Sequence, residues 1–151
     1  MNINKAQKII FNELISRGNV AMYDFDESNV FITPDGTYGF VLPLNSIQLN
    51  TAKMRKITPL NIASVVKEEN LCHLSKELLL QEHPKAYLRK LKNGDRNIYF
   101  NSKKMECFQN PKFYNEGNTS IIVVTEDISP IRQNSIVGVI LPVRVVEEQF
   151  M

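Results

Sequence analysis

The pattern Gly-apolar-apolar-Leu-Pro occurs twice in this chain, as YGFVLP at 38–43 and as VGVILP at 137–142. Short runs rich in β-branched and aromatic residues are typical of strands. Proline has no backbone N–H, so each strand is expected to lie at a sheet edge, or to stop pairing, at its proline. Two such strands far apart in the chain predict a protein built from two similar halves; the alternative is a chance likeness, since short apolar strands resemble one another.

Both halves have the same predicted order of elements, β-α-β-β-β. In the first half, apolar residues at helical spacing predict a helix over 5–17 with Asn4 as its N-cap. In the second half, a strand at 97–100 precedes a helical run at 103–109. The remaining predicted strands are 20–25, 30–33, 38–42, 120–125, a short one near 131, and 136–145. The stretch 110–118 contains a proline, a glycine and three asparagines and is predicted to be a loop.

The residues between the halves predict helix. Thr58 is a suitable N-cap followed by proline at the first helical position, and leucines continue at helical spacing to Gln81. After Pro84, the sequence LRKLKNGDRNIY predicts a hairpin that turns at Asn93-Gly94.

These elements predict a single α+β domain over residues 1–151. Its halves, about 1–49 and 86–151, are expected to join through the strands 38–42 and 136–143, with both helices on one face of the sheet. The result would be a two-layer domain with a helical insertion at about 57–83. A chain of 151 residues, 43% of them hydrophobic, can bury one sizeable core.

Charge and apolar runs argue against several classes of protein. The chain has 18 Lys and Arg against 16 Asp and Glu, and the net charge of +2 is too small to predict nucleic-acid binding by itself. No apolar run approaches the roughly 20 residues that a spanning helix needs. Because Lys5 and Lys8 interrupt the apolar stretch of any signal peptide, we expect a cytoplasmic protein, in which Cys72 and Cys107 are reduced thiols.

Residues that could bind a metal are scattered. Cys72 and His73 are adjacent, so they point in different directions on a helix, and His83 and Cys107 complete no zinc motif. Asp24 and Asp26 share a strand face, where they would hold a divalent ion, act as an acid–base pair or simply face solvent. No phosphate-binding loop or nucleophile motif is present. We therefore expect no metal, no cofactor and no catalytic activity.

Several segments together match one known pattern. MNINKAQKIIFNELI looks like an opening strand and helix, and NVAMYDFDESNVFITPDG looks like the hairpin that follows them. FNSKKMECF is similar to a second helix, TEDISP to a Thr-Asp-x-x-Ser-Pro stretch, and ILPVRV to a terminal Met-Pro-x-Arg strand with Leu141 in place of methionine. In this order the segments resemble a domain of the bacterial sliding clamp, the beta subunit of DNA polymerase III. Residues 50–85 have no counterpart in that family.

The resemblance implies a partner and two sites. In clamps the paired helices face DNA, which implies that four lysines contact duplex phosphates without reading bases: Lys5, Lys8, Lys103 and Lys104. As ordinary solvated lysines they would have no such role. A clamp ring contains several domains and this chain holds one, so a homo-oligomer would be needed to enclose DNA. The terminal strand of clamps borders a peptide-binding pocket, and the residues at that position are Leu141, Pro142, Val143 and Arg144. Plain packing at a sheet edge is the alternative role for this strand.

Two other functions stay open. Residues 62–81 followed by the hairpin fit a helix-turn-helix with a basic wing, in which Arg89, Lys90, Lys92 and Arg96 contact phosphates. A protein-interaction or structural module without a nucleic-acid role needs no special residues.

Overall fold

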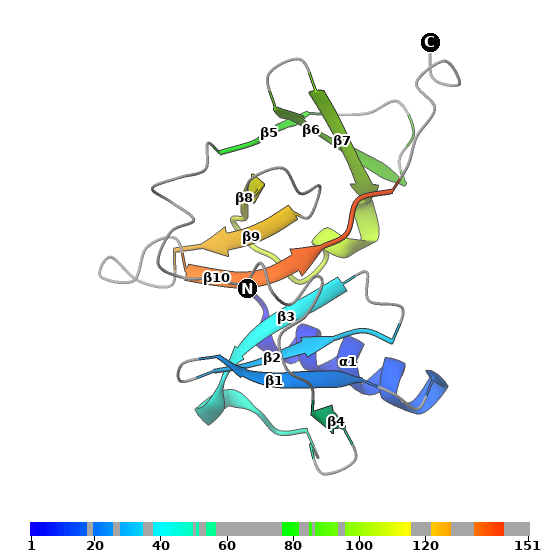
Figure 1. Cartoon of the computed structure of the whole chain (residues 1–151), viewed down its shortest axis with the longest axis vertical. Helices are drawn as coiled ribbons and strands as arrows, with labels where there is room; N and C mark the ends of the chain where they lie inside the picture. The colour runs from blue at the N-terminus through cyan, green and yellow to red at the C-terminus, as the bar shows by residue number, and fades with distance from the viewer. Residues whose placement is uncertain are drawn as a thin grey trace.

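The computed structural model describes residues 1–17, 20–25, 28–34, 38–49, 51, 54–56, 77–81, 85, 87–93, 96–115, 122–127 and 135–143. Within these ranges the chain forms one α-helix, α1 (Ile3–Arg17), and strands arranged in two sheets (Figure 1). The larger sheet has the strand order β4-β1-β2-β3-β10-β9-β8 and the smaller one has the order β5-β6-β7. The strands are β1 (Ala21–Phe25), β2 (Ser28–Ile32), β3 (Tyr38–Pro43), β4 (Arg55–Lys56), β5 (Leu79–Gln81), β6 (Leu88–Asn93), β7 (Arg96–Asn101), β8 (Lys112–Asn115), β9 (Ile122–Glu126) and β10 (Ser135–Ile140). Two 3-10 turns, η1 (Leu44–Ser46) and η4 (Ser102–Met105), complete the described structure.

The two copies of the repeated motif lie side by side at the centre of the larger sheet. β3 and β10 pair antiparallel, with Gly39 opposite Val139, so the predicted joining of these two segments in one sheet is confirmed. Pro43 is the last residue of β3, and Pro142 follows the end of β10. Both prolines therefore stand where strand pairing stops, as their missing N–H requires.

The two copies nevertheless occupy different environments. A Cβ on Gly39 would lie 2.6 Å from Ile32 Cδ1, whereas a Cβ on Gly138 would lie 2.6 Å from Phe108 Cζ. Ile32 and Phe108 belong to different apolar clusters, one on each face of the sheet. The pairing of β10 with β9 is irregular between Ile136 and Gly138, and a shift of one residue turns a side chain to the other face. Matching residues in the two copies of the motif therefore do not occupy equivalent positions in the fold.

The smaller sheet is connected to the larger one at both of its edges. Leu78 N donates to Phe113 O at 2.8 Å, which links the start of β5 to β8. Val143 N donates to Tyr99 O at 2.8 Å, which links the segment after β10 to β7. The six strands from β5 to β10 therefore form a closed, barrel-like circuit in the second half of the chain.

One apolar core runs along one face of the larger sheet and through this circuit. Over β1, β2 and β3 it is completed by α1, whose Ala6 and Ile10 are buried. Over β8, β9 and β10 it is completed by the smaller sheet, whose Phe100 ring lies 5.6 Å from the Phe113 ring between centroids. The opposite face of the larger sheet carries a second buried cluster that includes Val30 and Val139.

The predicted fold class was wrong. We expected an α+β domain of two β-α-β-β-β halves with a helical insertion, but the described structure is mostly β-sheet with a single α-helix. Six strands of the larger sheet pair antiparallel, β4 joins β1 in parallel, and the smaller sheet is antiparallel. The described residues 1–2 form no strand before α1, and the helix predicted at 103–109 is only the short turn η4, which Asn101 caps through a hydrogen bond from Lys103 N to its Oδ1 at 2.9 Å.

Two further local predictions were wrong and one was confirmed. The helix expected to reach Gln81 is strand β5 at 79–81, and most of the predicted insertion lies outside the described residues. The predicted loop at 110–118 contains strand β8, because Phe113 is buried in the core. The hairpin is confirmed as β6 and β7, although its register pairs Asn93 with Arg96, so that Gly94-Asp95 connects the strands. Among the described residues, no helix is long and apolar enough to cross a membrane.

Candidate nucleic-acid interface

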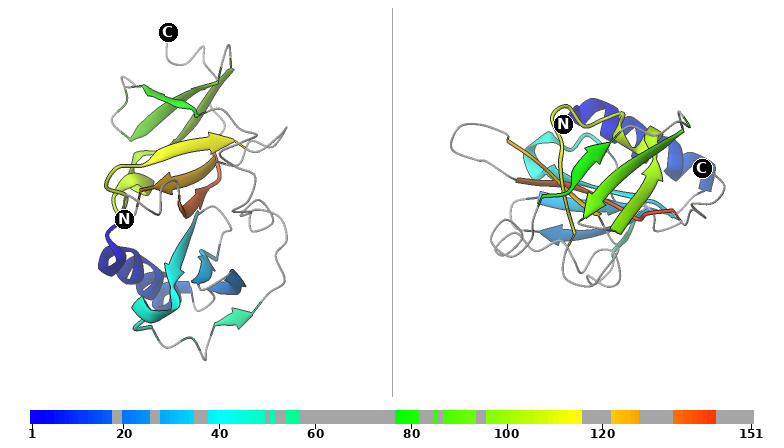
Figure 2. Two further views of the ribbon diagram at one scale, coloured as in Figure 1. Left: turned by 90° about the vertical axis from the view of Figure 1, so that its left-hand side faces the viewer. Right: turned by 90° about the horizontal axis from the view of Figure 1, so that it is seen from above.

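The four lysines of the predicted DNA contact lie on two elements that share one side of the strands. Lys5 and Lys8 are on α1, and Lys103 and Lys104 are on η4. Asn2 N donates to Cys107 O at 2.7 Å, which joins the start of α1 to the residues that follow η4. The left view of Figure 2 shows α1 and the short yellow-green η4 on the same side of the strands. The structure thus places the two lysine pairs in one layer, which we call the helical layer (residues 1–17 and 101–109).

The helical layer carries the net positive charge of the chain. It contains five Lys and Arg against two Glu, which gives +3, whereas the whole chain has +2. One of the two acids, Glu13, forms an ion pair with Arg17 at 3.3 Å between Oε2 and Nε. A charge this unevenly distributed creates a local positive potential that the overall charge conceals.

The lysines differ in how far they are available to a ligand. Lys5, Lys8 and Lys103 are exposed, but Lys104 is half-buried. Its Nζ lies 5.9 Å from the centroid of the Tyr38 ring, and its carbonyl oxygen accepts a hydrogen bond from Tyr38 Oη at 2.6 Å. Lys104 is therefore partly engaged with the first residue of β3.

Tyr38 also contacts a buried thiol, because its Oη lies 3.3 Å from Cys107 Sγ. Burial raises the pKa of Cys107 to about 11. Burial likewise raises the pKa of Tyr38, and the neighbouring Cys107 adds to that effect. Both groups are neutral near pH 7, so they add no charge to the helical layer.

The residues implied in peptide binding do not form a separate edge strand. β10 itself is an internal strand between β3 and β9, and the candidate residues follow its end. Leu141 and Pro142 are half-buried after its end, and the backbone of Val143 bonds to Tyr99. Arg144 lies outside the described residues.

No metal centre is formed by the described residues, which contain no group of three or more His, Cys, Asp or Glu placed to hold an ion. Asp24 is exposed, and the Asn29 amide, in the orientation that satisfies its neighbours, donates to Asp24 Oδ1 at 2.9 Å. Asp26, Cys72, His73 and His83 lie outside the described residues.

The basic hairpin of the alternative function is part of the smaller sheet. Lys92 is exposed, while Arg89 and Lys90 are half-buried. The side chain of Arg96 is not among those that the structure describes. The second helix of a helix-turn-helix was expected to include 78–81, but this segment is paired in β-structure.

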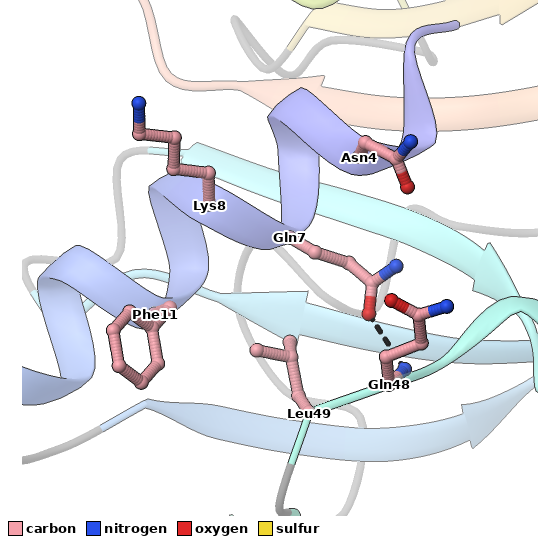
Figure 3. Close-up of a pocket in the computed structure, with 6 residues that line it drawn as sticks. All are labelled: Asn4, Gln7, Lys8, Phe11, Gln48 and Leu49. Atoms are coloured by element: carbon pink, nitrogen blue, oxygen red, sulfur yellow. Dashed lines mark hydrogen bonds between the residues drawn. The ribbon is translucent and has the colours of Figure 1, made fainter.

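One surface feature was not predicted. An open groove of about 470 Å³ lies between α1 and residues 48–49, as Figure 3 shows. It is lined by Asn4, Gln7, Lys8, Phe11, Gln48 and Leu49. Phe11 is one of the apolar residues of the predicted helix, yet its side chain is 49% exposed. A glutamine at position 7, between buried Ala6 and Ile10, was the available signal that a polar contact interrupts the apolar stripe of the helix.

Comparisons of the chain with protein-family models, with curated proteins and with solved structures gave no match.

Proposed function

We propose that this protein is a non-catalytic accessory protein that contacts duplex DNA through the helical layer without reading its sequence. The observation that carries the proposal is the charge distribution, since residues 1–17 and 101–109 hold +3 while the rest of the chain is close to neutral. Exposed lysines on one layer suit the phosphate backbone, whose contacts position a protein but carry no base information.

Neighbouring interactions support this assignment for three of the four lysines. Lys5, Lys8 and Lys103 are exposed and have no acidic partner in the part of the chain that the structure describes. Lys104 contributes less because it lies over the Tyr38 ring. A single layer touches one side of a duplex, so enclosing DNA would require self-association of the chain.

A salt titration with paired variants tests the proposal. Binding of a mixed-sequence duplex should weaken steeply with salt, because each neutralised phosphate releases a counterion. Lys5→Gln with Lys8→Gln should reduce the slope of log affinity against log salt by about 2. Lys103→Gln with Lys104→Gln should reduce it by between about 1 and 2, since Lys104 is partly engaged elsewhere.

The matched control is Lys90→Gln with Lys92→Gln on β6, which removes the same charge from the smaller sheet. This variant should leave the slope unchanged. If it carries the slope instead, the hairpin is the DNA contact and the helical layer is not. Undetectable binding at low salt would reject a DNA-associated function altogether.

A further inference from the structure

α1 exposes large apolar side chains that the core does not use. The side chain of Phe11 is 49% exposed and that of Ile15 is 68% exposed. Residues four positions apart lie on the same side of a helix, so these two are neighbours on the outer surface of α1. Contiguous exposed apolar side chains are a common feature of surfaces that bind another molecule.

The groove beside Phe11 is preformed. Gln7 is buried, and its Nε2 donates to Ser46 O at 3.0 Å while its Oε1 accepts from Gln48 N at 2.7 Å. These two hydrogen bonds hold the segment at 47–49 against the helix. A binding surface fixed in this way loses little conformational entropy when a ligand binds.

The two ends of the groove have different chemistry. In Figure 3, Phe11 and Leu49 lie toward one end, and the amide side chains of Asn4 and Gln48 lie toward the other. Among the described interactions, the amides of Asn4 and Gln48 have no hydrogen-bond partner. An amide both donates and accepts, so this pair matches the N–H and C=O groups of an extended peptide backbone.

The positive charge around the groove favours a peptide with acidic residues. Lys8 forms the rim of the groove, with its ammonium directed away from Gln48, and Lys5 is exposed on the preceding part of α1. Opposite charge on a partner would be attracted to this rim, and like charge would be repelled. DNA phosphates would satisfy the lysines, but they would leave Phe11 and Ile15 without apolar contacts.

We propose that this groove docks a short extended peptide segment of a protein partner, with a large apolar side chain between Phe11 and Leu49 and acidic residues beside Lys8. The proposal goes beyond DNA binding: Lys8 is shared with the predicted phosphate contacts, but Phe11 and Leu49 are not among them and Lys103 is outside the groove.

The test uses the full chain, labelled with ¹⁵N, and three sets of short capped peptides. The first set carries one Leu or Phe flanked by Asp and Glu, the second replaces the acids by Lys, and the third replaces the apolar residue by Ser. The first set should shift the side-chain amide signals of Gln7 and Gln48 together with the backbone signals of 47–49. The second set should bind about tenfold more weakly, and the third should not bind at a measurable level.

Matched variants separate the groove from the rest of the surface. Phe11→Ser should weaken binding of the first set about tenfold, whereas Tyr87→Ser, which removes a 56% exposed aromatic from the other sheet region, should not change it. Lys8→Gln should reduce the preference for acidic over basic peptides about threefold, and Lys103→Gln should leave it unchanged. All four positions are exposed, so the unfolding midpoints should match that of the parent chain and confirm that each variant is folded.

Several results would overturn the proposal. Absence of peptide binding, or binding that Phe11→Ser does not weaken, would reject the groove as a docking site. Retention on phosphatidylcholine vesicles with roughly one part in five phosphatidylserine, lost in Phe11→Ser and without peptide binding, would assign the surface to a membrane. Sedimentation as a dimer that Phe11→Ser converts to a monomer would assign it to self-contact. The salt slope of Lys103→Gln on DNA reports on the proposed function independently of these outcomes.

Discussion

The same face of the larger sheet is covered in two different ways. Over β1, β2 and β3 the cover is α1, which buries Ala6 and Ile10. Over β8, β9 and β10 the cover is the three-stranded sheet β5-β6-β7, which buries Leu91 and Phe100. The face itself is apolar in both regions, so the strands alone do not determine what packs on them.

The difference arises where the second half could have formed a helix and did not. Asn101 begins η4 with a side-chain cap, in the way that Asn2 begins α1 by accepting from Lys5 N at 3.0 Å. After the end of η4, Cys107 and Phe108 enter the core, and Gln109 N and Asn110 N donate to Glu126 Oε2 at 2.6 and 2.9 Å. Those N–H groups would bond to carbonyls one turn earlier in a continuing helix. The Glu126 carboxylate on β9 thus accepts the hydrogen bonds that backbone carbonyls would accept if the helix continued.

The largest expected effect compares the two covers directly. Phe40 under α1 and Phe100 in the smaller sheet are both fully buried. Replacing either by Ala should lower the free energy of unfolding by about 3–5 kcal/mol through lost apolar burial and cavity formation. Urea unfolding should be followed by helical circular dichroism, which reports on α1, and by tyrosine fluorescence. In each variant the two probes should give the same transition.

Leu44→Ala is the control for this pair, because Leu44 is large and apolar but 53% exposed, and it should change stability by no more than about 0.5 kcal/mol. A Phe100→Ala variant that melts the smaller sheet while α1 keeps the parent midpoint would show that the two covered regions fold independently.

A smaller effect is expected at the two glycines of the repeated motif. A Cβ on Gly138 would lie 2.9 Å from the backbone oxygen of Gly39 and 2.6 Å from the Phe108 ring, neither of which moves easily. A Cβ on Gly39 would lie 2.6 Å from Ile32 Cδ1, the end of a flexible side chain, 2.9 Å from Val139 Cγ2 and 3.0 Å from the backbone oxygen of Phe31. We therefore expect Gly138→Ala to cost about 2–3 kcal/mol of stability and Gly39→Ala about 1 kcal/mol.

Urea unfolding of both glycine variants measures these losses, provided that the m-value is unchanged. Equal losses of unfolding free energy in the two variants would contradict this order. They would indicate that the motif copies are equivalent after all, despite facing opposite sides of the sheet.

The parts of the fold that were predictable follow local patterns. The hairpin β6–β7 has a strong turn sequence between two alternating runs, and the strands β1, β2, β3, β9 and β10 are dense in β-branched and aromatic residues. Such patterns depend only on residues close in sequence. They identify an element without saying what it packs against.

The wrong predictions concern segments whose secondary structure depends on residues distant in the sequence. Leucines at 78–80 fit a helical spacing as well as a strand, and pairing with β6 and β8 selects the strand. Residues 110–115 have loop composition, yet burial of Phe113 against Phe100 makes part of them β8. At the candidate site, the predicted phosphate contacts Lys5 and Lys8 are exposed on α1, but the exposure of Phe11 depends on where residues 48–49 run, which the helix sequence does not contain.

The smallest expected effect concerns the junction of the two covered regions, where Tyr38 of β3 contacts Cys107 after η4. The pKa of Cys107 is raised from its ordinary value of 9.0 to about 11, so above pH 9 the unfolded chain releases this proton more readily than the folded one. Stability from this group is therefore complete below pH 9 and is lost as pH rises toward 11, by about 1 kcal/mol between pH 9 and pH 10. Tyr38 and Tyr23 act in the same direction from pH 10 upward, because burial raises the pKa of both.

Cys107→Ala removes only the thiol contribution, so its unfolding free energy should fall about 1 kcal/mol less than that of the parent chain across the same interval. Identical pH dependence in the two proteins would mean that the thiol is not held neutral at this junction, and the contact between the helix-covered and sheet-covered regions would then be looser than the Tyr38–Cys107 distance indicates.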